Sequence, residues 1–243
     1  MTAEVALPLA GVADSFSGAI DFIFSERESF GGGTQVGGLG DVWELMRTHL
    51  LVSALALGAS LVVALPIGLA LGHRGTGEFA AVSLGNAGRA IPELALIAFV
   101  AAFLGVGLLN VTIALMVLGI PPILTNTFVG IRQVDRDAVE AARGMGMTEA
   151  EVLRRVELPL AAPTIMAGVR TAAINIVATA TIASLAGEST LGDFIINRNV
   201  YGDEGVLAGA ILVATLAITV ELGLAGVQRL VTPRGLILAR SRG

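Results

Sequence analysis

Long apolar runs alternate with short polar segments along this chain. Residues 50–71 carry no charge and supply the roughly 20 residues that a membrane-spanning helix needs. Residues 94–131 are also uncharged, but residues 94–104 alone would reach roughly 16 Å at ~1.5 Å per residue, short of the ~30 Å hydrocarbon core. We therefore expect the second span to begin near residues 79–86. The pattern predicts an all-α integral membrane protein with five transmembrane helices, over about 50–71, 79–104, 109–131, 161–186 and 206–231.

Composition supports the membrane assignment and excludes several classes of protein. Hydrophobic residues make up 54% of the chain and charged residues 14%, against about 25% charged residues in soluble domains. The net charge of −5 argues against nucleic-acid binding, which requires a basic surface. The chain has no cysteine, which excludes a disulfide, a thiolate nucleophile and a Cys-ligated metal, and its 2 histidines are too few for a His-based metal site without many carboxylates. No nucleophile–base set is visible in the sequence either. All 15 basic residues are arginine, so the lysine of a phosphate-binding P-loop is missing and the chain cannot be an ATPase of that class.

The first 48 residues are predicted to form an extracytoplasmic extension without the basic start of a secretory signal. Residues 15–28 carry one apolar stripe at helical spacing, which fits either a helix lying flat on the membrane surface or a variable extension. The Gly-rich residues 31–40 are expected to be a flexible linker. The transmembrane domain would then cover residues 49–232, followed by a cytoplasmic tail, residues 233–243. The apolar stripe consists of Phe16, Ala19, Ile20, Ile23 and Phe24.

A polar segment, residues 135–159, separates the third and fourth predicted spans and is predicted to form a helical hairpin. Asp135 is a suitable N-cap for the first helix, and Gly146 ends it because glycine adopts a left-handed backbone without steric cost. Thr148 opens the second helix with a Thr-x-x-Glu capping box. That helix is expected to end before the fourth span at two prolines, Pro159 and Pro163.

The arginines predict the orientation of the spans, because cytoplasmic loops carry an excess of basic residues. If the hairpin is cytoplasmic, ten arginines lie on its side of the membrane, two lie within the membrane and three lie on the other side. This bias places the N-terminus outside and the C-terminus in the cytoplasm. The three outer arginines are Arg27, Arg47 and Arg198.

Two ionisable residues fall deep within predicted spans. Arg170 in the fourth span and Glu221 in the fifth both lie roughly 13–15 Å from the cytoplasmic side at ~1.5 Å per residue. An unpaired intramembrane charge costs at least ~2.5–3.5 kcal/mol, so we expect an ion pair that holds the two spans together. The alternative is that one of the two lines a polar pathway through the membrane.

Other polar residues of the spans could also border such a pathway. Arg89 and Glu93 flank Pro92, which fits either an ordinary helix start or a broken helix beside a pathway. For the polar side chains of the third and fourth spans, the default expectation is that they form hydrogen bonds between helices. Aromatic residues are too sparse for a cage around a quaternary ammonium group. The possible pathway residues are Arg89, Glu93, Asn126, Asn175 and Thr179.

The hairpin also carries a recognisable motif. Residues 140–142 (Glu-Ala-Ala), Gly146 and residues 156–159 match the pattern EAA-x3-G-x9-I-x-LP, with Val156 in place of isoleucine. Here the chain resembles the EAA loop of bacterial ABC-importer permeases, the binding-protein-dependent, MetI-like family. The resemblance covers roughly residues 43–235. Within this family the chain looks most like permeases of glycine betaine/carnitine/choline (osmoprotectant) importers, on residues 90–96, 119–127 and 178–183.

This resemblance implies a permease subunit in the bacterial plasma membrane, with a MetI-like core and no cofactor of its own. The hairpin would be the coupling helix that docks on a separate ATPase subunit, which binds the ATP. A second permease subunit, identical or homologous, would complete the pathway. An extracellular substrate-binding protein would deliver the solute, with residues 188–204 as its candidate contact. The expected coupling residues are Glu140, Ala141, Ala142, Gly146, Leu158 and Pro159.

Two other functions remain open at this point. The first is a permease for another small solute, such as an amino acid, a sulfonate or nitrate. The second is an ion-coupled secondary transporter that uses Glu93 or Glu221 as a proton site. The sequence shows no internal repeat of the kind that secondary transporters often carry, and the hairpin motif has no role in them.

Overall fold

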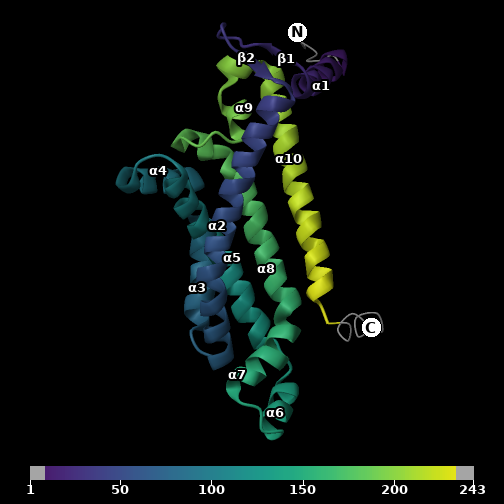
Figure 1. The fold of residues 1–243 in the computed structure, drawn as a ribbon. Helices are drawn as coiled ribbons and strands as arrows, with labels where there is room; N and C mark the ends of the chain where they lie inside the picture. Colours follow the sequence, from purple (N-terminus) through teal and green to yellow (C-terminus); the bar gives the residue numbers. More distant parts are fainter. Residues whose placement is uncertain (1–8, 234–243) are drawn as a thin grey trace, which may run out of the picture.

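The computed structural model describes residues 9–233, without the side chains of some residues in α1 and α3. Long helices lie side by side, with a helical hairpin at one end and the N-terminal elements at the other (Figure 1). The elements are α1 (Leu9–Phe24), β1 (Glu26–Glu28), β2 (Gln35–Gly37), α2 (Gly38–Arg74), α3 (Glu78–Ala90), α4 (Glu93–Leu104), α5 (Leu108–Arg132), α6 (Arg136–Gly144), α7 (Glu149–Val152), the π-helical turn η1 (Leu153–Glu157), α8 (Leu158–Thr179), the 3-10 helix η2 (Ala180–Ala186), α9 (Gly192–Ile196) and α10 (Arg198–Val231).

Helices long and apolar enough to cross a membrane number 4 in the described part of the chain. They correspond to the first, third, fourth and fifth predicted spans. The second predicted span is instead divided into α3 and the shorter apolar helix α4. These four long helices are Gly38–Arg74, Leu108–Arg132, Glu149–Ala186 and Arg198–Val231.

The break between α3 and α4 lies at Ile91 and Pro92. Proline restricts the residue before it to an extended backbone, and Ile91 has φ −77° and ψ 122°. Pro92 then serves as the N-cap of α4, whose first residue is Glu93. The helix is therefore broken at this proline, and Pro92 stands immediately before the first turn of α4 instead of within it. In Figure 1, α4 runs across the direction of the long helices.

The centre of the bundle is α5, which packs between α2 and α8. Small residues permit this close packing, as is common between membrane helices. A Cβ atom added to Gly68 of α2 would come within 2.7 Å of Thr127, and one added to Gly168 of α8 within 2.5 Å of Asn126. The contact between the three helices is filled by buried apolar side chains, among them Ala64, Ile123 and Ala172.

The structure corrects the predicted flexible linker over residues 31–40. Residues 35–37 form β2, which pairs antiparallel with β1 in the register Arg27↔Val36, and α2 already begins at Gly38. Three of the glycines that suggested flexibility, Gly31, Gly32 and Gly33, instead lie in the turn of this β-hairpin, where Gly32 and Gly33 have φ values of 79° and 80°. The predicted domain boundary at residue 48 falls within α2.

The amphipathic N-terminal helix is present as α1, but it ends at Phe24 instead of Glu28 because residues 26–28 pair as β1. Its predicted apolar stripe divides into two faces. Ala19 and Ile23 are buried against the bundle, whereas Phe16, Ile20 and Phe24 are 50%, 46% and 64% exposed. Burial of Phe22, outside the predicted stripe, anchors the helix.

The second helix of the hairpin does not end at Pro159 or Pro163, contrary to the prediction. The chain continues helically from Glu149 through η1 into α8, with Pro159 near the start of α8 and Pro163 inside it. The wider π-helical turn accommodates a proline ring that would otherwise collide with the carbonyl four residues earlier. The hairpin is therefore continuous with the long helix α8.

Candidate functional site

The hairpin formed by α6 and α7 has the local geometry that its sequence predicts. The Asp135 carboxylate accepts a hydrogen bond from the Asp137 amide at 2.9 Å and caps α6. Gly146 has φ 85° and ends the first helix. Thr148 and Glu151 form both hydrogen bonds of a capping box at the start of α7. The predicted starts of both helices and the turn between them are thus confirmed.

The residues of the EAA motif do not all face the same way. Glu140, Ala141 and Gly146 are exposed, whereas Ala142 is 2% exposed and packs into the protein. At the end of the motif, Leu158 and Pro159 are half-buried at the start of α8. The exposed residues of the motif are available to a partner. The buried Ala142 instead packs α6 against the rest of the protein.

An ionic network that the sequence did not predict joins this hairpin to the end of α2. His73 of α2 lies between two carboxylates, with Nδ1 2.6 Å from Glu157 Oε2 and Nε2 3.2 Å from Glu149 Oε2. Arg143 of α6 donates two hydrogen bonds of 2.9 Å to Glu149, and this contact raises the pKa of Arg143. Both ring nitrogens of His73 therefore face a carboxylate.

Glu157 is the buried member of this network, at 5% exposure. A buried carboxylate requires a hydrogen-bonding or charged partner. The partner of Glu157 is His73, which lies 84 positions away in the chain. We call the set His73, Arg143, Glu149 and Glu157 the hairpin network. It ties α2, α6, α7 and η1 to one another.

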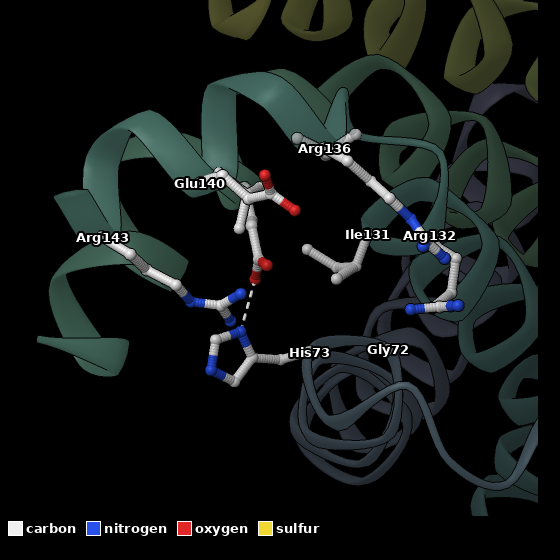
Figure 2. Close-up of a pocket in the computed structure, with 10 residues that line it drawn as sticks. Gly72, His73, Ile131, Arg132, Arg136, Glu140 and Arg143 are labelled. Atoms are coloured by element: carbon white, nitrogen blue, oxygen red, sulfur yellow. Dashed lines mark hydrogen bonds and ion pairs between the residues drawn. The ribbon is translucent and has the colours of Figure 1, made fainter.

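A cavity of about 250 Å³ adjoins the hairpin network. Figure 2 shows Glu140 and Arg143 of α6 on one side, with His73 below them and Arg132 across the cavity. The carboxylate of Glu140 points into the cavity instead of away from it (Figure 2). Both signs of charge line the space, which lies between the hairpin and the ends of α2 and α5.

A second cavity, of about 220 Å³, lies beside the break between α3 and α4. It brings together three of the possible pathway residues, Glu93, Asn175 and Thr179. Asn126 is not among them, because its amide donates to the Pro122 carbonyl at 2.8 Å and it packs against Gly168. The side chain of Arg89 lies outside the described residues. We call this space the break cavity; its other lining residues are Gly88, Leu118, Pro121, Pro122 and Ala178.

The structure also brings together Arg170 of α8 and Glu221 of α10, which form an ion pair. Arg170 donates a second hydrogen bond to Gln228 at 2.6 Å, and Gln228 donates to the Pro163 carbonyl at 2.9 Å. Gln228 was not predicted, although it lies seven residues after Glu221 and therefore on the same helical face. Within residues 9–233, no group of three or more His, Cys, Asp or Glu side chains could hold a metal ion.

Comparison with known proteins places this arrangement in a family. Residues 63–234 match the family described as "Binding-protein-dependent transport system inner membrane component". The chain belongs to this family. It is thus a multi-pass inner membrane protein and the permease subunit of an ABC transporter, not itself an enzyme, and the ATP is bound by a partner.

Curated relatives of this permease are similar over most of their length. The chain is 42% identical over 189 residues to the glycine betaine/carnitine/choline transport system permease protein OpuCB of Bacillus subtilis, covering 77% of this chain and 87% of the relative. It is 41% identical, with the same coverage, to the choline transport system permease protein OpuBB of that organism. It is 40% identical to the carnitine transport permease protein OpuCB of Listeria monocytogenes, covering 80% of this chain and 90% of the relative.

Solved structures share the fold of this permease. A chain of the MetNI methionine ABC transporter in an inward-facing conformation aligns with a TM-score of 0.69 at 21% identity, covering 80% of this chain and 98% of that one. A chain of an amino acid ABC transporter solved with histidines aligns with a TM-score of 0.63 at 22% identity, covering 79% and 94%. The expectation of a MetI-like core is therefore confirmed at the level of the fold.

Proposed function

We propose that this permease forms the pathway of an ATP-driven importer for quaternary ammonium osmoprotectants of the glycine betaine, choline and carnitine type. The observation that carries the proposal is the identity of 40–42% to three permeases whose names state these solutes. Such identity extends over about four-fifths of the chain, so it is not confined to the hairpin motif.

Growth under osmotic stress tests the solute. A bacterial strain without its own betaine uptake would express this chain together with its ATPase, its binding protein and any second permease. We expect glycine betaine or choline to restore growth at high salt only when the whole set is present. Rescue by an amino acid, a sulfonate or nitrate alone would contradict the assignment. Loss of uptake on collapse of the proton gradient, with ATP held constant, would instead favour an ion-coupled transporter.

The topology proposed for this importer has five spans, with α3 and α4 together making the second. The positive-inside bias of the arginines supports an outer N-terminus and a cytoplasmic hairpin. The C-terminal residues 234–243 lie outside the described residues, and we propose a cytoplasmic location for this tail. A reporter that is active only in the cytoplasm, fused after residue 233 and inserted after Gly146 in separate variants, should be active at both sites.

We propose that the exposed face of the hairpin docks on the ATPase subunit. Glu140, Ala141 and Gly146 are exposed there, and the small alanine permits close approach of a partner. Because η1 and α8 continue directly from α7, a displacement of the hairpin would move α8 as a rigid body.

A charge reversal tests this docking surface. Glu140→Lys should lower both the co-purification of the ATPase and solute uptake, because it reverses the charge of an exposed residue of the motif that also borders the cavity beside the hairpin network. Asp137→Lys makes the same change of charge on α6 outside the EAA motif and serves as the control. Unchanged co-purification and uptake in Glu140→Lys would exclude this face as the contact.

The pathway is proposed to form between two homologous permeases. The chain is similar both to OpuCB of Bacillus subtilis, at 42% identity, and to OpuCD of the same organism, at 34%, and both carry the name of one transport system. An affinity-tagged chain should therefore co-purify a second, different permease with the ATPase. Recovery of copies of this chain alone would support a homodimer. We also propose residues 188–204 as a contact for the extracellular binding protein.

The N-terminal extension is proposed to hold α1 flat on the outer membrane surface. Phe16, Ile20 and Phe24 form an exposed apolar face next to the face that packs on α10. Trp43 of α2 is 69% exposed and is the single tryptophan of the chain. Lipids brominated near the headgroup should quench its fluorescence more than lipids brominated at the chain ends, as expected for an aromatic at the interface.

A further inference from the structure

We propose that the break cavity is a subsite for cationic headgroups and that Glu93 supplies its charge. The inference rests on the proposed function only in placing this cavity on the solute route. It concerns the chemistry by which the permease itself selects a solute after the binding protein has released it.

Three polar side chains from two helices meet in this cavity. Glu93 begins α4, and Asn175 and Thr179 lie one turn apart on α8. Glu93 and Asn175 are exposed, and Thr179 is half-buried, so all three are open to a solute. The volume of about 220 Å³ is sufficient for a trimethylammonium group and a few atoms beyond it.

A second feature of the break cavity is a pair of prolines in α5, Pro121 and Pro122. Pro121 and Pro122 have no N–H, so the carbonyls of Val117 and Leu118 lose the donors that would follow four residues later in α5. Leu118 and both prolines line the cavity. Carbonyl oxygens that lack a helical donor are suitable acceptors for a cation in a membrane protein. The described lining of the break cavity contains no positively charged side chain.

Glu93 has no ion pair or hydrogen bond with another described side chain. A quaternary ammonium group cannot donate an N–H hydrogen bond, so a protein attracts it through aromatic faces or through negative charge. The lining of the break cavity contains no aromatic residue. The negative charge of Glu93 therefore attracts the cationic headgroup, a role that aromatic rings have in other sites. The polar groups of Asn175 and Thr179 solvate the remainder of the solute.

Cysteine chemistry measures the charge of this cavity directly, because the chain has no natural cysteine. In the assembled importer carrying Asn175→Cys, the thiol of this chain would be modified with a trimethylammonium-ethyl or a sulfonatoethyl thiosulfonate and followed by the mass of the chain. We expect the cationic reagent to react roughly tenfold faster than the anionic one, after correction for a free thiol. Adding Glu93→Gln should reduce that preference to near unity, whereas Glu93→Asp should preserve it.

Two controls separate Glu93 from its surroundings. Thr171→Cys lies one turn from Asn175 on the same exposed face of α8 but does not line the cavity, so Glu93→Gln should leave its preference unchanged. Arg89→Ala should leave the preference at position 175 in place or increase it.

The inference is overturned if Asn175→Cys shows the same preference with and without Glu93→Gln, or if it reacts with neither reagent. Loss of the preference in Arg89→Ala would also overturn it. None of these readings depends on which solute the importer carries. If the reagent preference follows Glu93 but no quaternary ammonium compound restores growth, the proposed function fails and this inference stands.

Discussion

At the N-terminal end of the molecule, α1 packs on α9 and α10 through aromatic rings, whereas at the hairpin end ionisable side chains join α6 and α7 to α2. Phe22, Phe194 and Tyr201 meet edge to face, with ring centroids 4.9–6.2 Å apart, and Phe22 and Phe194 are fully buried. At the hairpin, Arg143 and Glu149 are 45% and 59% exposed. The N-terminal end is thus packed like a protein core, whereas the hairpin end is held mainly by polar, solvent-exposed contacts.

This difference has a consequence for motion. Close-packed aromatic rings lose many contacts when they separate, so they hold one arrangement. Exposed ion pairs exchange partners with little change in free energy. We infer that the N-terminal end is the fixed part of the permease and that the hairpin end can shift against α2. The exception at the hairpin end is Glu157, which is buried with His73.

The largest expected effect is at the aromatic cluster. Phe22→Ala removes a fully buried ring and should destabilise the protein by about 3–5 kcal/mol. The measurement is the midpoint of thermal unfolding in detergent. Phe24→Ala is the matched control, because Phe24 lies on the same helix but is 64% exposed. Equal losses in the two variants would show that the N-terminal end is not held by this cluster.

The next effect tests the buried member of the hairpin network. His73→Ala leaves Glu157 buried without a partner, which should cost about 3 kcal/mol. It should also lower the solute carried per ATP hydrolysed, because the hairpin is no longer tied to α2. Adding Glu157→Gln should recover part of the stability by removing the unpaired charge. A single variant as stable as the natural protein would mean that Glu157 finds another partner.

The sequence predicts the hairpin more closely than any other part of the fold. Asp135, Gly146 and Thr148 act through neighbours within a few residues, so their effect on the backbone is visible locally. His73 and Glu157 are 84 residues apart, and no local pattern connects them. Arg170 and Glu221 could be predicted as partners because similar depth in the membrane is a property that sequence does encode.

The wrong predictions of local structure occur where glycine and proline are compatible with more than one backbone conformation. The glycines between residues 31 and 40 fit a flexible linker, but in the structure Gly31, Gly32 and Gly33 lie in the turn between β1 and β2, and the others belong to β2 and α2. Pro159 fits a helix stop, but the π-helical turn before it relieves the clash. In both places the outcome depends on tertiary packing, which residue type alone does not specify.

A smaller effect is expected between the two ends, at Arg170 and Glu221. A double-mutant cycle with Arg170→Ala and Glu221→Ala should give a coupling energy of about 1 kcal/mol, because both side chains are partly exposed and polar pairs in membranes are modest. The readout is again the thermal unfolding midpoint. Strictly additive losses would mean that the contact does not hold α8 to α10. Gln228→Ala, which removes a neighbour of Arg170, should cost less than either single variant.

The smallest expected effect is at the exposed part of the hairpin network. Arg143→Ala should leave the unfolding midpoint unchanged, because Arg143 and Glu149 both lie in solvent, where water and salt screen their attraction. His73 would still contact Glu149, so the hairpin would keep a link to α2. Raising the salt concentration should likewise leave the stability of Arg143→Ala and the natural protein equal. If Arg143→Ala instead destabilises the protein as much as His73→Ala, the four side chains act as one cooperative unit, and the hairpin end is as fixed as the aromatic end.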